Sequence, residues 1–151
     1  QDHPGALLVL ANANGDYKEE IENLLKDLPQ ENFITISFEP DIITLYRLFN
    51  VFVHVPVDAH SEAFGQVYVE ALAAQLPCVF TVSGIANDFI KNNVNALVVD
   101  YKSENEIYNA LRKILSDINF SNQIAAQGKK DVMQLFGIQR MITQLEKVYE
   151  Q

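Results

Sequence analysis

The stretch VFVHVPVDAHSEAFGQVYVEALAAQLPCVFTV, residues 51–82, decides the fold. It begins with the apolar run 51–55, which predicts a strand that ends before Pro56. After a polar loop, the small and apolar residues of 64–76 predict a helix, and 78–82 predicts another strand. A strand, a helix and a strand in this order predict a right-handed βαβ unit with parallel strands.

The same alternation continues on both sides of this stretch. Strands are predicted at 6–11, 33–38 and 96–99, and the first of them is expected to be buried on both faces. Asp16 and Ser103 are expected to cap helices, and Gly137 is expected to separate the last two helices. Helices are predicted at 16–28, 41–49, 103–117, 121–136 and 138–149. The pattern predicts an α/β fold, namely a Rossmann-like three-layer domain with a parallel sheet and helices on both faces.

The composition is that of an ordinary folded domain. The chain has 151 residues, of which 48% are hydrophobic and 21% charged, which argues against disorder or a fibrous repeat. No apolar run reaches the roughly 18 residues of a membrane helix, and the start does not resemble a signal peptide, so we expect a cytoplasmic chain without a transmembrane segment. The single Cys78 rules out an internal disulfide and is expected to be a small buried side chain.

The charge is negative and unevenly distributed. The net charge of -9 argues against a protein that binds nucleic acid in general. Residues 1–90 hold three basic and thirteen acidic residues, whereas 91–151 hold eight basic and seven acidic ones. An anionic ligand must therefore be held by backbone groups, by the later basic residues, or by parts of the protein outside this sequence.

The loop and helix at 57–74 carry the best candidates for chemistry, because ligands of open parallel sheets bind beyond the carboxyl ends of the strands. Gly65 lies at the predicted helix start, where unpaired N–H groups and the helix dipole can hold a phosphate. Glu70 is the only formal charge between 63 and 81, and a pair of ribose hydroxyls would satisfy its carboxylate. Glu62, eight residues earlier, would reach the hydroxyls of a sugar beyond the phosphates.

A simpler interpretation of the two acids remains open. Glu62 would then only favour the helix dipole, and Glu70 would lie on a solvated stripe with Gln66.

The segment SEAFGQVYVEALAAQLPCV, residues 61–79, resembles the Glu-x7-Glu motif of retaining glycosyltransferases of the GT-B fold, glycosyltransferase family 4 or group 1. Other features follow in family order, so the resemblance extends over nearly the whole chain. These features are Gly15, Tyr46, Asn50, Pro56, the turn 83–87 and the segment 92–99. The resemblance implies that 1–151 is the nucleotide-sugar-binding domain, the C-terminal half of a GT-B fold, with 138–150 as its last helix.

The resemblance also implies a donor site. Glu70 would bind the ribose, and the amides of 64–67 would meet the diphosphate. Glu62 is the catalytic candidate and would hold the donor sugar. The region 38–42 would flank the base. The substrate-binding residues that it implies are Glu62, Phe64, Gly65, Gln66, Val67, Glu70, Gly84 and Ile85. Ala63 and Gln75 stand where the family usually has Gly, and we expect ordinary backbone angles at both.

The implied reaction transfers a sugar from a nucleotide-diphospho-sugar donor to an acceptor hydroxyl with retention, without a metal or another cofactor. Its implied setting is polysaccharide biosynthesis in the cytoplasm, or at the membrane periphery in the full-length protein. Two parts of the family fold lie outside this sequence. One is the first strand-helix unit, which carries an Arg and a Lys that neutralise the leaving diphosphate. The other is the N-terminal acceptor-binding domain. The isolated chain is therefore expected to bind donor weakly and to be inactive.

Two histidines and two other functions complete the predictions. His60 is expected to be a solvated loop residue and His54 a hydrogen-bonded core residue. A non-catalytic sugar-nucleotide-binding subunit is one alternative function, and an unrelated doubly wound enzyme such as a sugar-nucleotide epimerase is another.

Overall fold

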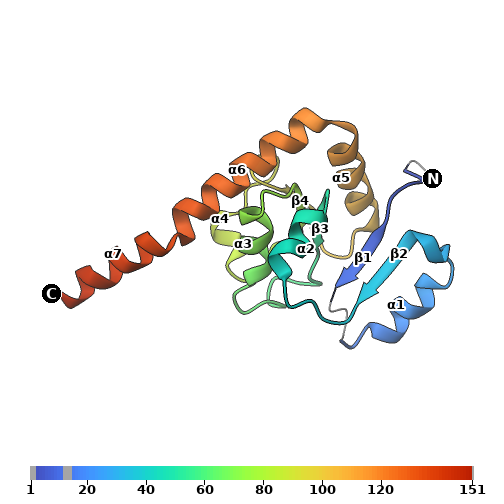
Figure 1. The fold of residues 1–151 in the computed structure, drawn as a ribbon, viewed down its shortest axis with the longest axis horizontal. Helices are drawn as coiled ribbons and strands as arrows, with labels where there is room; N and C mark the ends of the chain where they lie inside the picture. The colour runs from blue at the N-terminus through green and yellow to red at the C-terminus, as the bar shows by residue number, and fades with distance from the viewer. Residues whose placement is uncertain (1–2, 12–14, 151) are drawn as a thin grey trace. The chain divides into compact units, whose positions relative to one another are not determined.

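The computed structural model describes residues 3–11 and 15–150. The chain divides into two compact units, the N-terminal unit Gln1–Leu45 and the C-terminal unit Tyr46–Gln151 (Figure 1). The division falls within the helix α2 (Ile42–Leu48). Asp41 Oδ1 accepts a hydrogen bond from the N–H of Thr44 at 3.0 Å, so the predicted start of this helix after Pro40 is confirmed.

The N-terminal unit is a βαβ unit with parallel strands. The strand β1 (Leu8–Ala11) pairs with β2 (Phe33–Ile36), and Leu8 lies opposite Phe33. The helix α1 (Lys18–Leu25) and the short 3-10 helix η1 (Gln30–Asn32) connect them. The predicted order of strand, helix and strand is confirmed.

Three details of this unit differ from the predictions. Tyr17, and not Asp16, occupies the N-cap position of α1. The helix ends at Leu25 and not near Leu28, because the N–H of Leu28 bonds to the carbonyl of Leu25 in a tighter turn before Pro29. Leu8 is 45% exposed, so β1 is not buried on both faces.

The C-terminal unit contains a parallel sheet in the order β3-β4-β5. Its strands are β3 (Phe52–His54), β4 (Cys78–Phe80) and β5 (Leu97–Val98). The helix α3 (Gln66–Ala73) connects β3 to β4, as the sequence predicts, and the short helix α4 (Ala86–Phe89) follows β4 where only a turn is predicted. The α/β fold with parallel strands is confirmed, although the strand pairs described form one sheet in each unit.

Helices cover both faces of the sheet in the C-terminal unit. Phe80 and Leu72 of α3 belong to one buried cluster, whereas Val79 and Ile114 of α5 (Glu104–Ser116) belong to another. Successive side chains of a strand point to opposite faces, so β4 lies between two helix layers. Cys78, also on β4, is fully buried, as predicted, and its burial raises the pKa of its thiol.

Two long helices end the chain. Asp117 caps α6 (Ile118–Phe136) by accepting a hydrogen bond from the N–H of Phe120 at 3.0 Å, so the helix begins before the predicted residue 121. Ser103 occupies the N-cap position of α5, but within the described chain its side chain makes no capping hydrogen bond. Gly137 separates α6 from α7 (Ile138–Tyr149), as predicted, and α7 extends beyond the rest of the C-terminal unit (Figure 1). None of the described side chains of α7 is buried.

Candidate functional site

The site begins at Gly65, which occupies the N-cap position of α3 with a φ of 81°. This left-handed conformation strains a residue that has a Cβ. A Cβ here would also lie only 2.7 Å from the ring of Tyr68. Glycine is therefore needed at this helix start for two reasons, the backbone angle and the space beside Tyr68.

The first amides of α3 lack a protein hydrogen-bond acceptor among the described residues. The N–H of Tyr68 bonds to the carbonyl of Gly65 at 3.2 Å. Among the described residues, no protein acceptor meets the N–H groups of Gln66 and Val67. These groups lie at the positive end of the helix dipole, an arrangement that favours an anion such as a phosphate.

The turn after β4 packs against the loop before α3. The N–H of Gly84 bonds to the carbonyl of Ala59 at 3.4 Å, and that of Ile85 bonds to the carbonyl of Phe64 at 3.2 Å. Gly84 has a φ of 56°, and a Cβ there would lie 2.9 Å from the carbonyl oxygen of Glu62. The two loops are thus joined by backbone contacts that require glycine at 84.

Ser83 holds the backbone of Glu62, and His54 lies beside its carboxylate. Its N–H donates to the Oγ of the buried Ser83 at 3.0 Å. Its Oε1 lies 3.1 Å from Nε2 of His54, and 31% of the Glu62 side chain is exposed. The carboxylate therefore contacts His54 and is partly open to solvent.

His54 is not the hydrogen-bonded core residue that the sequence predicts. Its Nε2 is buried and makes no geometrically acceptable hydrogen bond among the described residues, although Glu62 is within ion-pairing distance. Burial lowers the pKa of His54, and the carboxylate of Glu62 opposes this shift. His60, in contrast, is exposed on its loop as predicted.

Glu70 receives a hydrogen bond at each carboxylate oxygen. The O–H of Tyr46, in α2, donates to Oε2 at 3.1 Å, and Nε2 of Gln66, one turn earlier in α3, donates to Oε1 at 2.9 Å. Burial raises the pKa of Tyr46, and the charge of Glu70 raises it further, so the phenol keeps its proton to donate. The carboxylate is therefore oriented by two donors from different helices.

The structure brings together most of the predicted site residues. Phe64 and Ile85 share a backbone hydrogen bond, Glu62 contacts the turn at Gly84, and Gln66 contacts Glu70. The predicted base-flanking region 38–42 belongs to the N-terminal unit, and its role stays a prediction.

Gln75 departs from the expectation of ordinary backbone angles, whereas Ala63 does not. Gln75 has a φ of 63° just after α3, and Ala63 is not among the residues with positive φ. The helix ends there with an N–H bond from Leu76 to the carbonyl of Ala71, a turn that requires the left-handed conformation.

The sequence did not predict that Tyr46 contacts Glu70 or that His54 contacts Glu62. Tyr46 lies 24 residues from Glu70, and His54 lies on the strand before the loop. The order of the sheet gives a partial signal, because a residue at the carboxyl end of β3 lies at the edge where loops of parallel strands form ligand sites.

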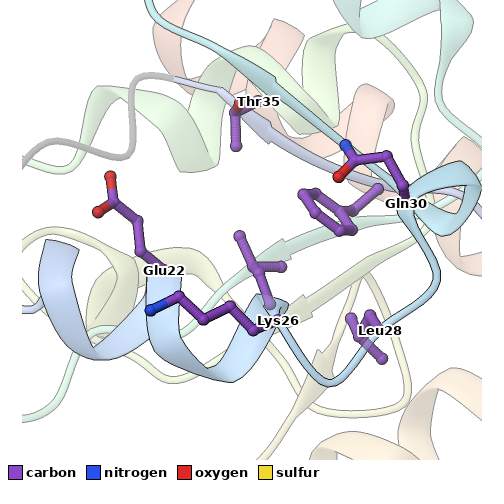
Figure 2. Close-up of a pocket in the computed structure, with 7 residues that line it drawn as sticks. Glu22, Lys26, Leu28, Gln30 and Thr35 are labelled. Atoms are coloured by element: carbon purple, nitrogen blue, oxygen red, sulfur yellow. The ribbon is translucent and has the colours of Figure 1, made fainter.

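A separate hollow lies in the N-terminal unit, between α1 and β2 (Figure 2). It has a volume of about 300 Å³, and Figure 2 shows Glu22 of α1 and Lys26, the residue after this helix, beside it. None of the predicted site residues lines it. Within the described part of the chain, no group of three or more His, Cys, Asp or Glu residues is placed to hold a metal ion.

The chain matches a known protein family. A family model described as "Glycosyl transferases group 1" matches residues 1–131. The chain therefore belongs to the group 1 glycosyl transferases, which confirms the resemblance seen in the sequence.

Individual relatives agree with this assignment. The capsular polysaccharide biosynthesis glycosyltransferase CapM of Staphylococcus aureus is 27% identical, over 95% of this chain and 37% of CapM. The crystal structure of Anabaena HepE in complex with UDP-glucose has a TM-score of 0.85 at 21% identity, over 97% of this chain and 41% of that chain. The C-terminal domain of a group 1 family protein, LpcC from Francisella tularensis, has a TM-score of 0.68 at 26% identity, over 80% of this chain and 62% of that chain.

The chain spans 37% of the length of CapM and of an uncharacterized glycosyltransferase from Methanocaldococcus jannaschii. Within residues 3–11 and 15–150, no helix is both long enough and apolar enough to cross a membrane.

Proposed function

We propose that the C-terminal unit binds a nucleotide-diphospho-sugar, the donor for retaining transfer of the sugar to an acceptor hydroxyl. The observation that carries the proposal is that Glu62 precedes, and Glu70 follows, a start of α3 whose first amides have no protein acceptor among the described residues. A donor of this class has polar groups in the same order, with sugar hydroxyls, a diphosphate and ribose hydroxyls.

The diphosphate would bind to the amides of Gln66 and Val67. Their N–H groups have no protein acceptor among the described residues, and the helix dipole adds a partial positive charge. Gly65 and Gly84 have positive φ angles, which shape the helix start and the adjoining turn beside these amides. This mode of binding suits a region that is poor in basic side chains.

Glu70 would accept hydrogen bonds from the ribose hydroxyls, with its carboxylate oriented by Tyr46 and Gln66. Glu62 would accept hydrogen bonds from the donor sugar and hold its reacting carbon toward the acceptor. In the reaction, the bond from the anomeric carbon to the phosphate oxygen breaks, a bond to the acceptor oxygen forms, and the proton of the acceptor hydroxyl passes to the leaving diphosphate. Charge builds up on the leaving diphosphate, where the α3 amides would stabilise it without a bound metal.

Two relatives support the substrate class and the setting. HepE forms a crystalline complex with UDP-glucose, and CapM is named for capsular polysaccharide biosynthesis. We propose polysaccharide biosynthesis in the cytoplasm, at the membrane periphery in the full-length protein. The acceptor would bind to the part of such a protein that this chain does not span, so the 151-residue chain alone would bind donor without turnover.

A titration tests the proposal. UDP-glucose, GDP-mannose and ADP-glucose are added to the chain in a calorimeter, and Glu70→Gln is measured in parallel. We expect one of the three nucleotide-sugars to bind, and the substitution to weaken it by about 1 to 3 kcal/mol because the ribose loses a charged partner.

Glu146→Gln, in the exposed helix α7, is the matched control for the loss of one negative charge. It should leave the affinity unchanged. Equal losses for both variants would mean that overall charge, and not the Glu70 site, governs binding, and the proposal would then be wrong.

A further inference from the structure

His54 contacts Glu62 in the candidate site, but the proposed mode of donor binding gives it no role. It is the last residue of β3, and its side chain is 24% exposed. Its Nε2 atom is buried, and among the described residues no hydrogen-bond partner meets it with acceptable geometry. A buried polar atom of this kind is costly unless a nearby group compensates it.

The imidazole is held in place by its packing. Its ring meets the ring of Tyr68 edge to face, with centroids 4.9 Å apart. Tyr68 is fully buried, and its O–H donates to the carbonyl of Thr81 at 2.7 Å. Tyr68 is fixed in this way, so the imidazole of His54 packs against a rigid neighbour besides Glu62.

The group that His54 reaches is Glu62. The Nε2 atom lies 3.1 Å from Oε1 of Glu62, whose backbone N–H is held by Ser83. An imidazole that carries a proton on Nε2 can therefore steady this carboxylate after a small rotation, while the exposed part of the side chain stays open to a ligand. A carboxylate steadied before binding loses less side-chain freedom when a ligand arrives.

We propose that His54 is a positioning residue for Glu62, and that it strengthens binding of the sugar portion of the donor and not of the nucleotide. This inference rests on the proposed function, in which Glu62 meets the sugar. It separates two parts of the site, because Glu70 and the α3 amides meet the ribose and the diphosphate without His54.

The test compares a nucleotide-sugar with its bare nucleoside diphosphate. The nucleotide-sugar is whichever of UDP-glucose, GDP-mannose and ADP-glucose binds to the unsubstituted chain. It is compared with its own diphosphate, which is UDP, GDP or ADP respectively. His54→Phe keeps an aromatic ring against Tyr68 but removes the nitrogen. We expect this variant to bind the nucleotide-sugar about threefold to tenfold more weakly, and to bind the bare diphosphate within about twofold of the unsubstituted chain.

Two further variants distinguish positioning from a structural effect. His54→Gln places an amide nitrogen near the position of Nε2, so it should restore most of the sugar-dependent affinity. In a Glu62→Gln background, His54→Phe should cause no additional loss, because His54 acts through the Glu62 carboxylate. Unchanged affinity for the bare diphosphate shows that each variant is folded.

Several results would overturn the inference. These are an unchanged sugar-dependent affinity in His54→Phe, an equal loss for sugar and bare diphosphate, or the same loss in the Glu62→Gln background. If the unsubstituted chain binds none of the three nucleotide-sugars, the proposed function is wrong, and this inference is wrong with it.

Discussion

Tyr46 holds one oxygen of Glu70, and its contribution to donor binding can be measured by removing a single hydroxyl. The O–H of Tyr46 donates to Oε2 at 3.1 Å, and the residue is otherwise packed against Phe49 and Phe52. Tyr46→Phe keeps the ring packing but leaves the carboxylate with one protein donor. We expect donor affinity, measured by calorimetry, to fall by about 0.5 to 1.5 kcal/mol. Tyr149→Phe, on the exposed end of α7, is the control, and an equal effect there would contradict the role of Tyr46.

Gly65 is predicted to be essential to the start of α3. Gly65→Ala puts a Cβ 2.7 Å from the ring of Tyr68 at a φ of 81°. The left-handed conformation alone costs about 1 to 2 kcal/mol, so urea denaturation should show a free energy of unfolding lower by about 2 kcal/mol or more.

Gln75, just after the other end of the same helix, provides a control in which glycine is introduced and not removed. It is exposed and has a φ of 63°, so Gln75→Gly should relieve strain and stabilise the chain by up to about 1 kcal/mol. The variant also removes the exposed hydrogen bond from Nζ of Lys129 to Oε1 of Gln75, at 3.4 Å, which should contribute little. A loss of stability of about 1 kcal/mol or more would therefore mean that the φ of 63° does not strain Gln75.

His54 makes folding stability depend on pH. Its folded pKa lies below the ordinary value of 6.5 because burial disfavours the cation, with Glu62 opposing the shift. Below pH 6.5 the unfolded state therefore takes up a proton before the folded state does, and stability should fall as the pH drops through the folded pKa.

The measurement is the difference in free energy of unfolding between the unsubstituted chain and His54→Gln, from pH 8 to pH 5. The unsubstituted chain should lose more stability on acidification, since the variant lacks this titration. A difference that stays constant, or that changes in the opposite direction, would show that burial does not lower this pKa.

At the scale of elements, the packing of α3 against α6 supports the donor helix. A Cβ at Gly128 of α6 would lie 2.5 Å from Leu72 of α3 and 3.0 Å from the carbonyl oxygen of Asn95. Although Ala favours a helix over Gly by about 1 kcal/mol, this contact should make Gly128→Ala destabilising by about 1 kcal/mol or more.

The control in the same helix is Ala126→Gly, at an exposed position. It should also destabilise the chain, by about 1 kcal/mol, but only through helix propensity. Donor affinity separates the two variants, because only Gly128→Ala displaces α3. If Gly128→Ala were stabilising, the close approach of the two helices would be wrong.

At the scale of the whole molecule, the sequence predicts the order of elements better than their ends. The alternation of apolar runs and helical patterns placed all the main strands and helices, because both periods are local properties. The start of α6 was missed by three residues because Asp117 caps it, and α1 ended early because the chain tightens before Pro29. The ends of a helix depend on single hydrogen bonds, and alternative bonds a few residues away are nearly as favourable.

The candidate site was predictable in part. Glu62, Gly65 and Glu70 are neighbours in sequence, so a motif reveals them. Tyr46 and His54 reach these acids only after the chain has folded, and their side chains fit a core position equally well. The pairing of each acid with a partner from another element therefore required the structure.

The most direct test of the donor site is an amide NMR spectrum of the chain, recorded with increasing amounts of the nucleotide-sugar that binds. We predict that the largest saturable shifts occur at Gln66 and Val67 and at the adjoining turn of Gly84 and Ile85, and that Glu70→Gln requires more ligand for the same shifts. Saturable shifts confined to residues outside 59–70 and 83–85 would contradict the donor site.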